Sequence, residues 1–438
     1  MSTLIIDGGK PLIGSVKISG SKNSVLKIIS ASMFCNDDVV VSNVPRVGDV
    51  FKYLEIIKEM GAKVDWIGNN KIVLNGAGLS TYIIPYELGS VYRIVNLLVG
   101  PLVFRFGKAI VPLSKSNRPV NRLIDTWKTL GMNIENDGKN LVIKAINLQQ
   151  SNIKFKINTL MGTDNAILSS LFISGETLIY NANEEPEVDD LVSFCNIIGG
   201  RVERVEPRLI KIIGTNIFKG GNFEVISDCN EAATFMTAAV VTNGNIFVTG
   251  VDRTSMTSFV NVLTKMGCKY EFSKDEVRVW RDNDQLNNIS VCTSPAPGFV
   301  SDWQSLTTLI ATQAEGESLI YDTVYHDRFE YTVDLNRMGA KIDLVTPSDA
   351  NFPLIVSDDL YDYSKLGEPH SVAKITGPTK LRGVKIGLTH FIDSSTLIIA
   401  ALCASGKSDV TGYGKVEKEL EDFINKLVNL GAQVSLSS

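Results

Sequence analysis

The chain of 438 residues is 44% hydrophobic and 21% charged, which is typical of a globular protein large enough to bury a sizeable core. Its 43 lysines and arginines and 48 aspartates and glutamates give a formal charge of −5 without a basic run, which excludes the electrostatic footprint of a nucleic-acid-binding protein. The six cysteines lack Cys-x-x-Cys spacing, so we expect reduced thiols and no zinc site.

The first segments in chain order give no targeting or membrane signal. Residues 1–20 alternate in hydrophobicity like a strand and lack the apolar stretch of a signal peptide. The apolar run of residues 97–104 is interrupted by Gly100-Pro101, and it is shorter than the roughly 20 residues that a membrane helix needs. We therefore expect a cytoplasmic protein without a membrane partner.

One short phrase recurs six times and predicts the same local structure each time. An amphipathic helix ends at a glycine in the left-handed conformation, and a strand of alternating hydrophobicity follows. The glycines are separated by 70, 68, 68, 72 and 92 residues. They are Gly61, Gly131, Gly199, Gly267, Gly339 and Gly431.

A second helix also repeats, running through small and aliphatic residues to a turn before a strand. Because these helices are apolar on most faces, we expect them to be buried between sheets, which argues against a single parallel barrel. Six units divide naturally into two lobes of three, with a cut near residue 225 and a small-molecule site expected between the lobes. The helices are predicted to open near Ser21, Ser90, Gly162, Asn230, Ser301 and Asp393.

Several further segments carry a family resemblance, in the same order along the chain. They are Ile18-Ser19-Gly20-Ser21-Lys22-Asn23, Asn43-Val44-Pro45, Gly100-Pro101-Leu102-Val103, Arg118-Pro119-Val120, Glu185-Pro186-Glu187, Pro297-Gly298-Phe299 and Arg328-Phe329. On these segments the chain resembles the enolpyruvyl transferases over essentially its whole length, and most closely those acting on UDP-N-acetylglucosamine. The resemblance implies a two-lobed inside-out α/β barrel of six βαβαββ units. Residues 21–226 would form one lobe, and residues 1–20 would join residues 227–438 in the other.

The resemblance also implies a reaction, in which the enolpyruvyl group of phosphoenolpyruvate moves to a hydroxyl of a phosphorylated acceptor and phosphate is released. No metal or organic cofactor is implied. In the family, the residues matching Lys22 and Asn23 hold substrate groups. Lys22 opens a helix, where a cation opposes the positive end of the macrodipole, so an anion is expected nearby. The alternative is a solvated surface lysine.

Three arginines match substrate-binding positions of the family. Arg118 matches a phosphate-binding arginine, and its planar guanidinium suits bidentate capture of phosphate or carboxylate. Arg93 matches another substrate-contacting arginine, and Arg328 matches one near the reacting centre. The alternatives are a surface loop position for Arg118, a helix-face salt bridge for Arg93, and an ion pair of Arg328 with Asp327 or Asp322.

Asp302 has two interpretations. By the resemblance it matches the base that takes the proton of the acceptor hydroxyl, and a carboxylate can do that work. Alternatively, Ser301-Asp302-Trp303-Gln304 fits a capping box, in which an acidic residue in the first turn stabilises the helix by itself.

The chain departs from the family before Arg118. There the family has a longer loop that commonly carries a cysteine, which acts as general acid and is the target of the epoxide fosfomycin. Residues 113–117 replace this loop and contain no cysteine. The proton for the substrate methylene must then come from another group, for which Lys115 and Lys22 are the candidates.

Two departures fall near the C-terminus. Where the family has an aspartate and an arginine, this chain has His390 and Ile392, and Thr411 replaces a further arginine. Loss of a phosphate-binding arginine could cost about 1.5–3 kcal/mol if its charged hydrogen bonds are not replaced. His390 and Lys415 are the remaining candidates for substrate binding in these segments, and Lys415 could equally be solvated.

Two replacements bear on which acceptor is used. Residues 160–162 stand where the UDP-N-acetylglucosamine enzymes have a serine-containing turn, and Asn121 stands where they usually have an aspartate. These changes favour another uridine nucleotide, such as a uridine monophosphate, although a UDP-sugar stays open. Two alternatives remain at this point. One is a nucleotide-binding paralogue without turnover, and the other is enolpyruvyl transfer to a different phosphorylated acceptor.

Overall fold

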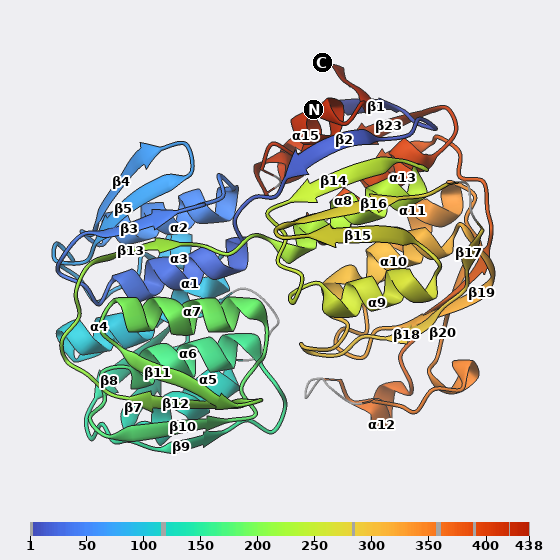
Figure 1. The fold of residues 1–438 in the computed structure, drawn as a ribbon. Coiled ribbons are helices and arrows are strands. Elements are labelled where there is room, and N and C mark those ends of the chain that lie inside the picture. The colour runs from blue at the N-terminus through green and yellow to red at the C-terminus, as the bar shows by residue number, and fades with distance from the viewer. Residues whose placement is uncertain are drawn as a thin grey trace. The chain divides into compact units, whose positions relative to one another are not determined.

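The computed structural model describes residues 3–114, 120–282, 285–355, 361–388, 391–419 and 421–437, with Phe391, Ile392, Lys415 and Glu419 described by their backbone alone. The chain forms two compact units (Figure 1). Unit 1 comprises Met1–Ser19 and Ser227–Ser438, and unit 2 comprises Gly20–Ile226. Each unit has its own hydrophobic core.

Unit 2 contains three small sheets in which one edge pairs in parallel and the other strands are antiparallel. The first has the order β13 (Gly221–Glu224), β3 (Val39–Ser42), β5 (Lys71–Asn75) and β4 (Lys63–Gly68). The second is β6 (Lys108–Pro112), β8 (Asn140–Ala145) and β7 (Met132–Asn136), with a parallel bridge at its edge. The third is β11 (Arg201–Glu206), β12 (Leu209–Ile213), β10 (Glu176–Tyr180) and β9 (Asn152–Lys154).

Unit 1 repeats this arrangement in three further sheets. They are β15 (Lys269–Ser273), β16 (Glu276–Trp280), β14 (Asn245–Thr249) and β2 (Ile13–Lys17); β17 (Leu286–Asn287), β19 (Ala314–Tyr321), β21 (Val372–Gly377) and β20 (Ile342–Val345), with β18 (Ser290–Cys292) also on β19; and β22 (Lys385–Gly387), β23 (Lys407–Thr411), β1 (Thr3–Asp7) and β24 (Gln433–Ser437). The N-terminal strand β1 pairs antiparallel with both β23 and β24, so the two ends of the chain complete one sheet.

The interior helices are the second helices expected from the repeat. They lie inward of the sheets, and almost every described residue of α1, α6, α8 and α10 is buried (Figure 1). This burial confirms the inside-out arrangement, because helices of such composition cannot face water. The interior helices are α1 (Lys22–Ser32), α4 (Val99–Phe106) after the 3₁₀ turn η1 (Arg93–Leu98), α6 (Leu160–Ser170), α8 (Cys229–Val241), α10 (Gln304–Ala311) after η2 (Ser301–Trp303), and α13 (Phe391–Cys403).

The amphipathic helices end at the glycines of the repeated phrase, as predicted. All six glycines have positive φ, between 79° and 109°, which a residue with a side chain adopts only with strain. These helices are α2 (Gly48–Glu59), α5 (Asn121–Thr129), α7 (Pro186–Ile197), α9 (Thr257–Lys265), α11 (Tyr331–Arg337) and α15 (Phe423–Asn429). Short helical turns complete the described structure: α3 (Tyr86–Gly89), η3 (Ser348–Ala350), α12 (Tyr363–Leu366), α14 (Tyr413–Val416) and η4 (Glu417–Glu419).

One hairpin differs from its equivalents. The strands that follow the repeated glycine return through two or three residues in the β4–β5, β7–β8, β11–β12 and β15–β16 hairpins. In the β20–β21 hairpin, 26 residues, numbers 346–371, separate Val345 from Val372. The fifth repeat therefore carries an insertion.

Candidate active site

Asp302 and Arg328, which are 26 positions apart, form an ion pair in unit 1. The Nη1 atom of Arg328 lies 2.9 Å from Oδ1 of Asp302, and the side chains are 15% and 41% exposed respectively. Within the described part of the chain, Oδ2 of Asp302 has no hydrogen-bond partner. The site therefore presents a partly accessible carboxylate oxygen beside a guanidinium.

A buried aspartate holds the two turns that carry this pair. Asp322, which is fully buried, accepts hydrogen bonds from Ser301 Oγ at 2.5 Å and Thr293 Oγ1 at 2.8 Å. It also accepts from the backbone N–H groups of Val324 and Tyr325, at 2.9 and 3.1 Å. Asp322 thus fixes both the start of η2 and the β19–α11 connection. From the sequence, Asp322 is expected only as a possible ion-pair partner of Arg328, and no local motif marks this positioning role.

Two alternative interpretations from the sequence are wrong. The capping box at Ser301 does not form, because its hydroxyl donates to Asp322 and neither η2 nor α10 has a side-chain cap. The ion pair that Arg328 makes is with Asp302, whereas Asp327 and Asp322 were the partners considered. Both interpretations rest on local sequence patterns, whereas the contacts of Ser301 and Arg328 are made with residues more than 20 positions away.

The charge of Arg328 is stabilised by its surroundings. Its guanidinium lies 4.4 Å from the centroid of the Tyr325 ring, a cation–π contact. Burial opposes the charge, but the proximity of Asp302, Tyr325 and Asp322 outweighs it and raises the pKa of Arg328 above its usual value. Arg328 is therefore a permanent cation that can bind an anionic substrate group.

Lys22 lies in unit 2 at the first residue of α1. Its Nζ is 2.9 Å from Oδ2 of Asp49, in the first turn of α2, and the two side chains are 22% and 28% exposed. Lys22 is therefore a partly buried, ion-paired lysine and not a solvated surface one. The N-cap hydroxyl of Ser21 accepts from Ser24 N–H at 3.3 Å and donates to Glu187 at 3.1 Å, which anchors this helix start.

Of the remaining predicted site residues, two are described with their side chains, one by its backbone alone, and three lie outside the described residues. Asn23 is half-buried in the first turn of α1, and Arg93 is half-buried at the start of η1. The backbone of Lys415 lies in α14, whereas its side chain is outside the described residues. Lys115, Arg118 and His390 also lie outside the described residues.

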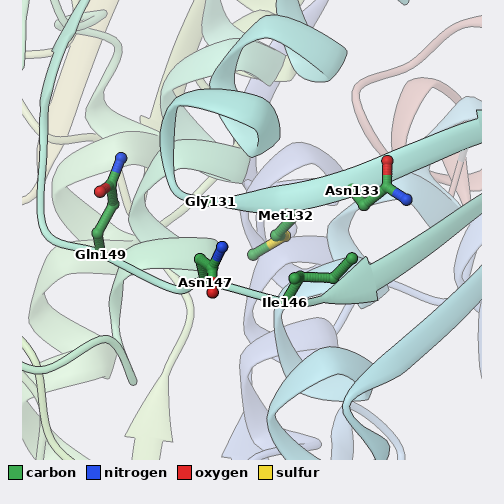
Figure 2. A pocket seen from close by; sticks show the side chains of 6 residues that line it. All are labelled: Gly131, Met132, Asn133, Ile146, Asn147 and Gln149. Carbon is green, nitrogen blue, oxygen red and sulfur yellow. The ribbon is translucent and has the colours of Figure 1, made fainter.

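Two of the hollows on the described surface differ in their relation to the predicted site residues. The larger, of about 410 Å³, lies in unit 2 between Asn133 and the segment Ile146 to Gln149, and no predicted site residue lines it in the described part of the chain (Figure 2). The smaller, of about 210 Å³, lies in unit 1 and is lined by His326, Asp327, Phe329 and His370, among others. The second hollow therefore adjoins the segment that carries Arg328.

The buried thiols lack the features of an activated nucleophile. None of the six cysteines forms a disulfide bond. Burial raises the pKa of Cys35 and Cys268 to about 12 and that of Cys403 to about 11. Among the described residues no group of three or more His, Cys, Asp or Glu side chains is arranged to hold a metal ion, and no described helix is long and apolar enough to span a membrane.

Comparison with known proteins identifies the class. The family model of EPSP synthase (3-phosphoshikimate 1-carboxyvinyltransferase) matches residues 6–427. The chain is 31% identical over 438 residues to UDP-N-acetylglucosamine 1-carboxyvinyltransferase 1 of Legionella pneumophila (strain Lens), covering 98% of this chain and 82% of the relative. The corresponding enzyme 1 of Staphylococcus aureus (strain MRSA252) is 31% identical over 441 residues, with 99% of both chains covered.

Solved structures show the same fold. The enolpyruvyl transferase NikO from Streptomyces tendae superposes with a TM-score of 0.86 at 21% identity, covering 100% of this chain and 99% of NikO. EPSP synthase of Acinetobacter baumannii gives a TM-score of 0.74 at 19% identity, with both chains covered fully. The fold and the family match together show that this chain is an enolpyruvyl (carboxyvinyl) transferase. The chain belongs to the EPSP synthase family of enzymes, which take the enolpyruvyl group from phosphoenolpyruvate.

Proposed function

We propose that this enzyme transfers the enolpyruvyl group to a hydroxyl of a uridine nucleotide or UDP-sugar. The Asp302–Arg328 pair carries the proposal, because it sets a partly exposed carboxylate 2.9 Å from a cation. The 31% identity to UDP-N-acetylglucosamine enzymes supports a uridine-containing acceptor. The replacements at residues 160–162 and Asn121 favour a nucleotide other than UDP-N-acetylglucosamine.

In this proposal Asp302 is the general base. Its Oδ2 accepts the proton of the acceptor hydroxyl as the hydroxyl oxygen bonds to C2 of phosphoenolpyruvate, and C3 gains a proton. The bond from C2 to the phosphate oxygen then breaks, C3 loses a proton, and the double bond is restored. Arg328 binds an anionic group next to the reacting carbon, where a fixed charge stabilises the negative charge that develops.

Unit 2 supplies the second group of residues in this proposal. Lys22, Asn23, Arg93 and Arg118 bind phosphate and carboxylate groups, and Lys22 or Lys115 delivers the proton to C3. Lys415 and His390 are proposed as further substrate-binding residues of unit 1. The ion pair with Asp49 holds Lys22 in place until an anionic substrate competes for it.

The test is phosphate release from phosphoenolpyruvate with uridine monophosphate, UDP-N-acetylglucosamine or shikimate 3-phosphate as acceptor. We expect release that requires both phosphoenolpyruvate and one of the uridine nucleotides. Release that needs no acceptor, or that occurs with shikimate 3-phosphate alone, would contradict the proposed acceptor class. Nucleotide binding without release would indicate a paralogue that has lost turnover.

A further inference from the structure

The insertion between β20 and β21 distinguishes the fifth repeat from the others. Residues 346–371 occupy a connection that needs two or three residues in the four equivalent hairpins. The described parts of this β20–β21 insertion are residues 346–355 and 361–371. A connection this long is unnecessary for closing a hairpin, and long insertions of this kind are commonly functional.

The insertion is attached to the element that leads to the candidate site. The Ile355 N–H donates to the Tyr321 hydroxyl at 3.0 Å, and the Phe352 and Tyr321 rings are 5.4 Å apart. Ser348 donates to Glu368 through both its hydroxyl, at 2.6 Å, and its N–H, at 3.0 Å, which ties the two described arms together. Tyr321 ends β19 and directly precedes the buried Asp322 that holds the site turns.

Two tyrosines of the insertion make edge-to-face contacts with a histidine of the Arg328 segment. The ring centroids of His326 lie 5.1 Å from Tyr361 and 5.7 Å from Tyr363, and the two tyrosines are 4.7 Å apart. The Tyr363 hydroxyl is 2.9 Å from Nε2 of His326. All three side chains are half-buried. These residues form what we call the aromatic wall.

His326 of the aromatic wall lies in the same connection as Arg328. His326 is two residues before Arg328, and the neighbouring Tyr325 ring lies under the Arg328 guanidinium. Asp322 accepts from the N–H groups of Val324 and Tyr325, so this connection is fixed in position. A hydroxyl that gives its proton to Asp302 must lie within hydrogen-bond reach of it, so the ring bearing that hydroxyl must also lie beside Arg328.

We propose that the aromatic wall determines acceptor specificity by packing against the sugar ring that carries the reacting hydroxyl. Aromatic faces bind the C–H face of a ring at low cost in conformational entropy, because they are rigid and only partly hydrated. The inference rests on the proposed function, since it assumes that Asp302 acts on the acceptor. It assigns to Tyr361 and Tyr363 a role in acceptor binding and none in binding phosphoenolpyruvate.

The experiment compares Tyr361→Leu and Tyr363→Leu with Tyr270→Leu. Tyr270 is a matched control, because it is half-buried in unit 1, pairs with the Phe272 ring at 6.0 Å and bonds Thr264 through its hydroxyl at 2.9 Å. KM is measured separately for phosphoenolpyruvate and for uridine monophosphate and UDP-N-acetylglucosamine. Calorimetric titration of each nucleotide into each variant gives the acceptor affinity without requiring turnover.

We expect KM and Kd for the accepted nucleotide to rise on the order of tenfold in both wall variants. KM for phosphoenolpyruvate should stay within about twofold, and Tyr270→Leu should match the wild type. Unchanged acceptor constants, a parallel rise in both KM values, or a wild type that binds neither nucleotide would overturn the inference. The wild type could instead bind the nucleotide without turnover while both wall variants bind it more weakly. That result would support the role of the aromatic wall and contradict the proposed function.

Discussion

Two cation–carboxylate pairs of similar length lie in opposite environments. In unit 2, Lys27 Nζ is 3.1 Å from Asp164 Oδ2, and both side chains are 2% exposed. In unit 1, Arg328 Nη1 is 2.9 Å from Asp302 Oδ1, with exposures of 15% and 41%. The first pair links the interior helices α1 and α6, whereas the second joins two turns at the ends of elements.

Burial, more than distance, separates a structural ion pair from a catalytic candidate. The Lys27–Asp164 pair has no access to a substrate, and its desolvation makes its net contribution to stability small even though loss of one partner is costly. The Asp302–Arg328 pair costs less to desolvate and can exchange partners with an anionic substrate. Substitutions at the two pairs should therefore affect different measurements.

The largest effect is expected at the partly exposed pair. Asp302→Asn keeps the shape of the side chain but removes the base, so kcat should fall about 10²–10⁴-fold with a modest change in KM. Steady-state phosphate release measures this. The matched control is Asp409→Asn, an exposed strand residue of the same unit, which should retain wild-type kcat. Equal kcat in Asp302→Asn and wild type would show that Asp302 is not the base.

The next effect concerns stability and the buried pair. Lys27→Met leaves Asp164 buried without its cation, so the free energy of unfolding should fall by about 3–5 kcal/mol. Denaturant titration measures the loss. The double variant Lys27→Met/Asp164→Leu should recover most of it, because it removes both charges from the core of unit 2. If Lys27→Met is as stable as the wild type, the ion pair of Lys27 with Asp164 does not stabilise the fold, and the prediction is wrong.

A third prediction uses the pH dependence of the same buried region. Burial raises the pKa of Asp164 and of Asp190 from 3.8 to about 6, and Asp190 accepts hydrogen bonds from the Ser24 hydroxyl and the Ile226 N–H. A raised carboxyl pKa means that the folded state binds the proton more tightly than the unfolded state. Stability from this source is therefore present below pH 4 and is lost as the pH rises to about 6.

Comparison of wild type with Asp190→Asn isolates this contribution. The wild type should lose up to about 3 kcal/mol more than the variant between pH 4 and 6.5 in denaturant titrations. The charged groups that act on Asp190 are Glu187 and Lys27, and both are unchanged in the variant. Parallel stability curves for the two proteins would contradict the raised pKa.

For fosfomycin we expect no effect on activity. Fosfomycin alkylates an exposed, activated thiolate, and the chain lacks the loop cysteine in residues 113–118. The raised pKa values of Cys35, Cys268 and Cys403 leave these thiols protonated. Activity should survive incubation with fosfomycin and an acceptor nucleotide, and the intact mass should be unchanged. Stoichiometric alkylation, at the half-buried Cys229 or any other thiol, would refute this prediction.

The fold class could be predicted from the sequence because it is encoded locally and repeatedly. A helix that stops before a strand needs a residue that tolerates positive φ, so the same glycine recurs at Gly61, Gly131 and four further positions. The buried second helices were readable from their composition alone. The β20–β21 insertion had a signal too, since the last glycine interval is 92 residues where the others are 68 to 72.

The site was predictable only as separate residues. Asp302 and Arg328 were named from motifs, but their mutual contact depends on Asp322 bonding to both turns. No local pattern marks Asp322 as that link. The Lys27–Asp164 pair was missed for a related reason, because a lysine within an apolar helix gives no sign of which distant carboxylate will meet it.

The most direct test of the proposed reaction follows the bridging oxygen of phosphoenolpyruvate. With oxygen-18 at that position and uridine monophosphate or UDP-N-acetylglucosamine present, mass spectrometry locates the label. Enolpyruvyl transfer breaks the bond from C2 to the bridging oxygen, so we predict the label in the released phosphate and one unlabelled enolpyruvyl group on the acceptor. Label found in pyruvate, with the acceptor unchanged, would mean that the enzyme breaks the phosphorus–oxygen bond and would contradict the account.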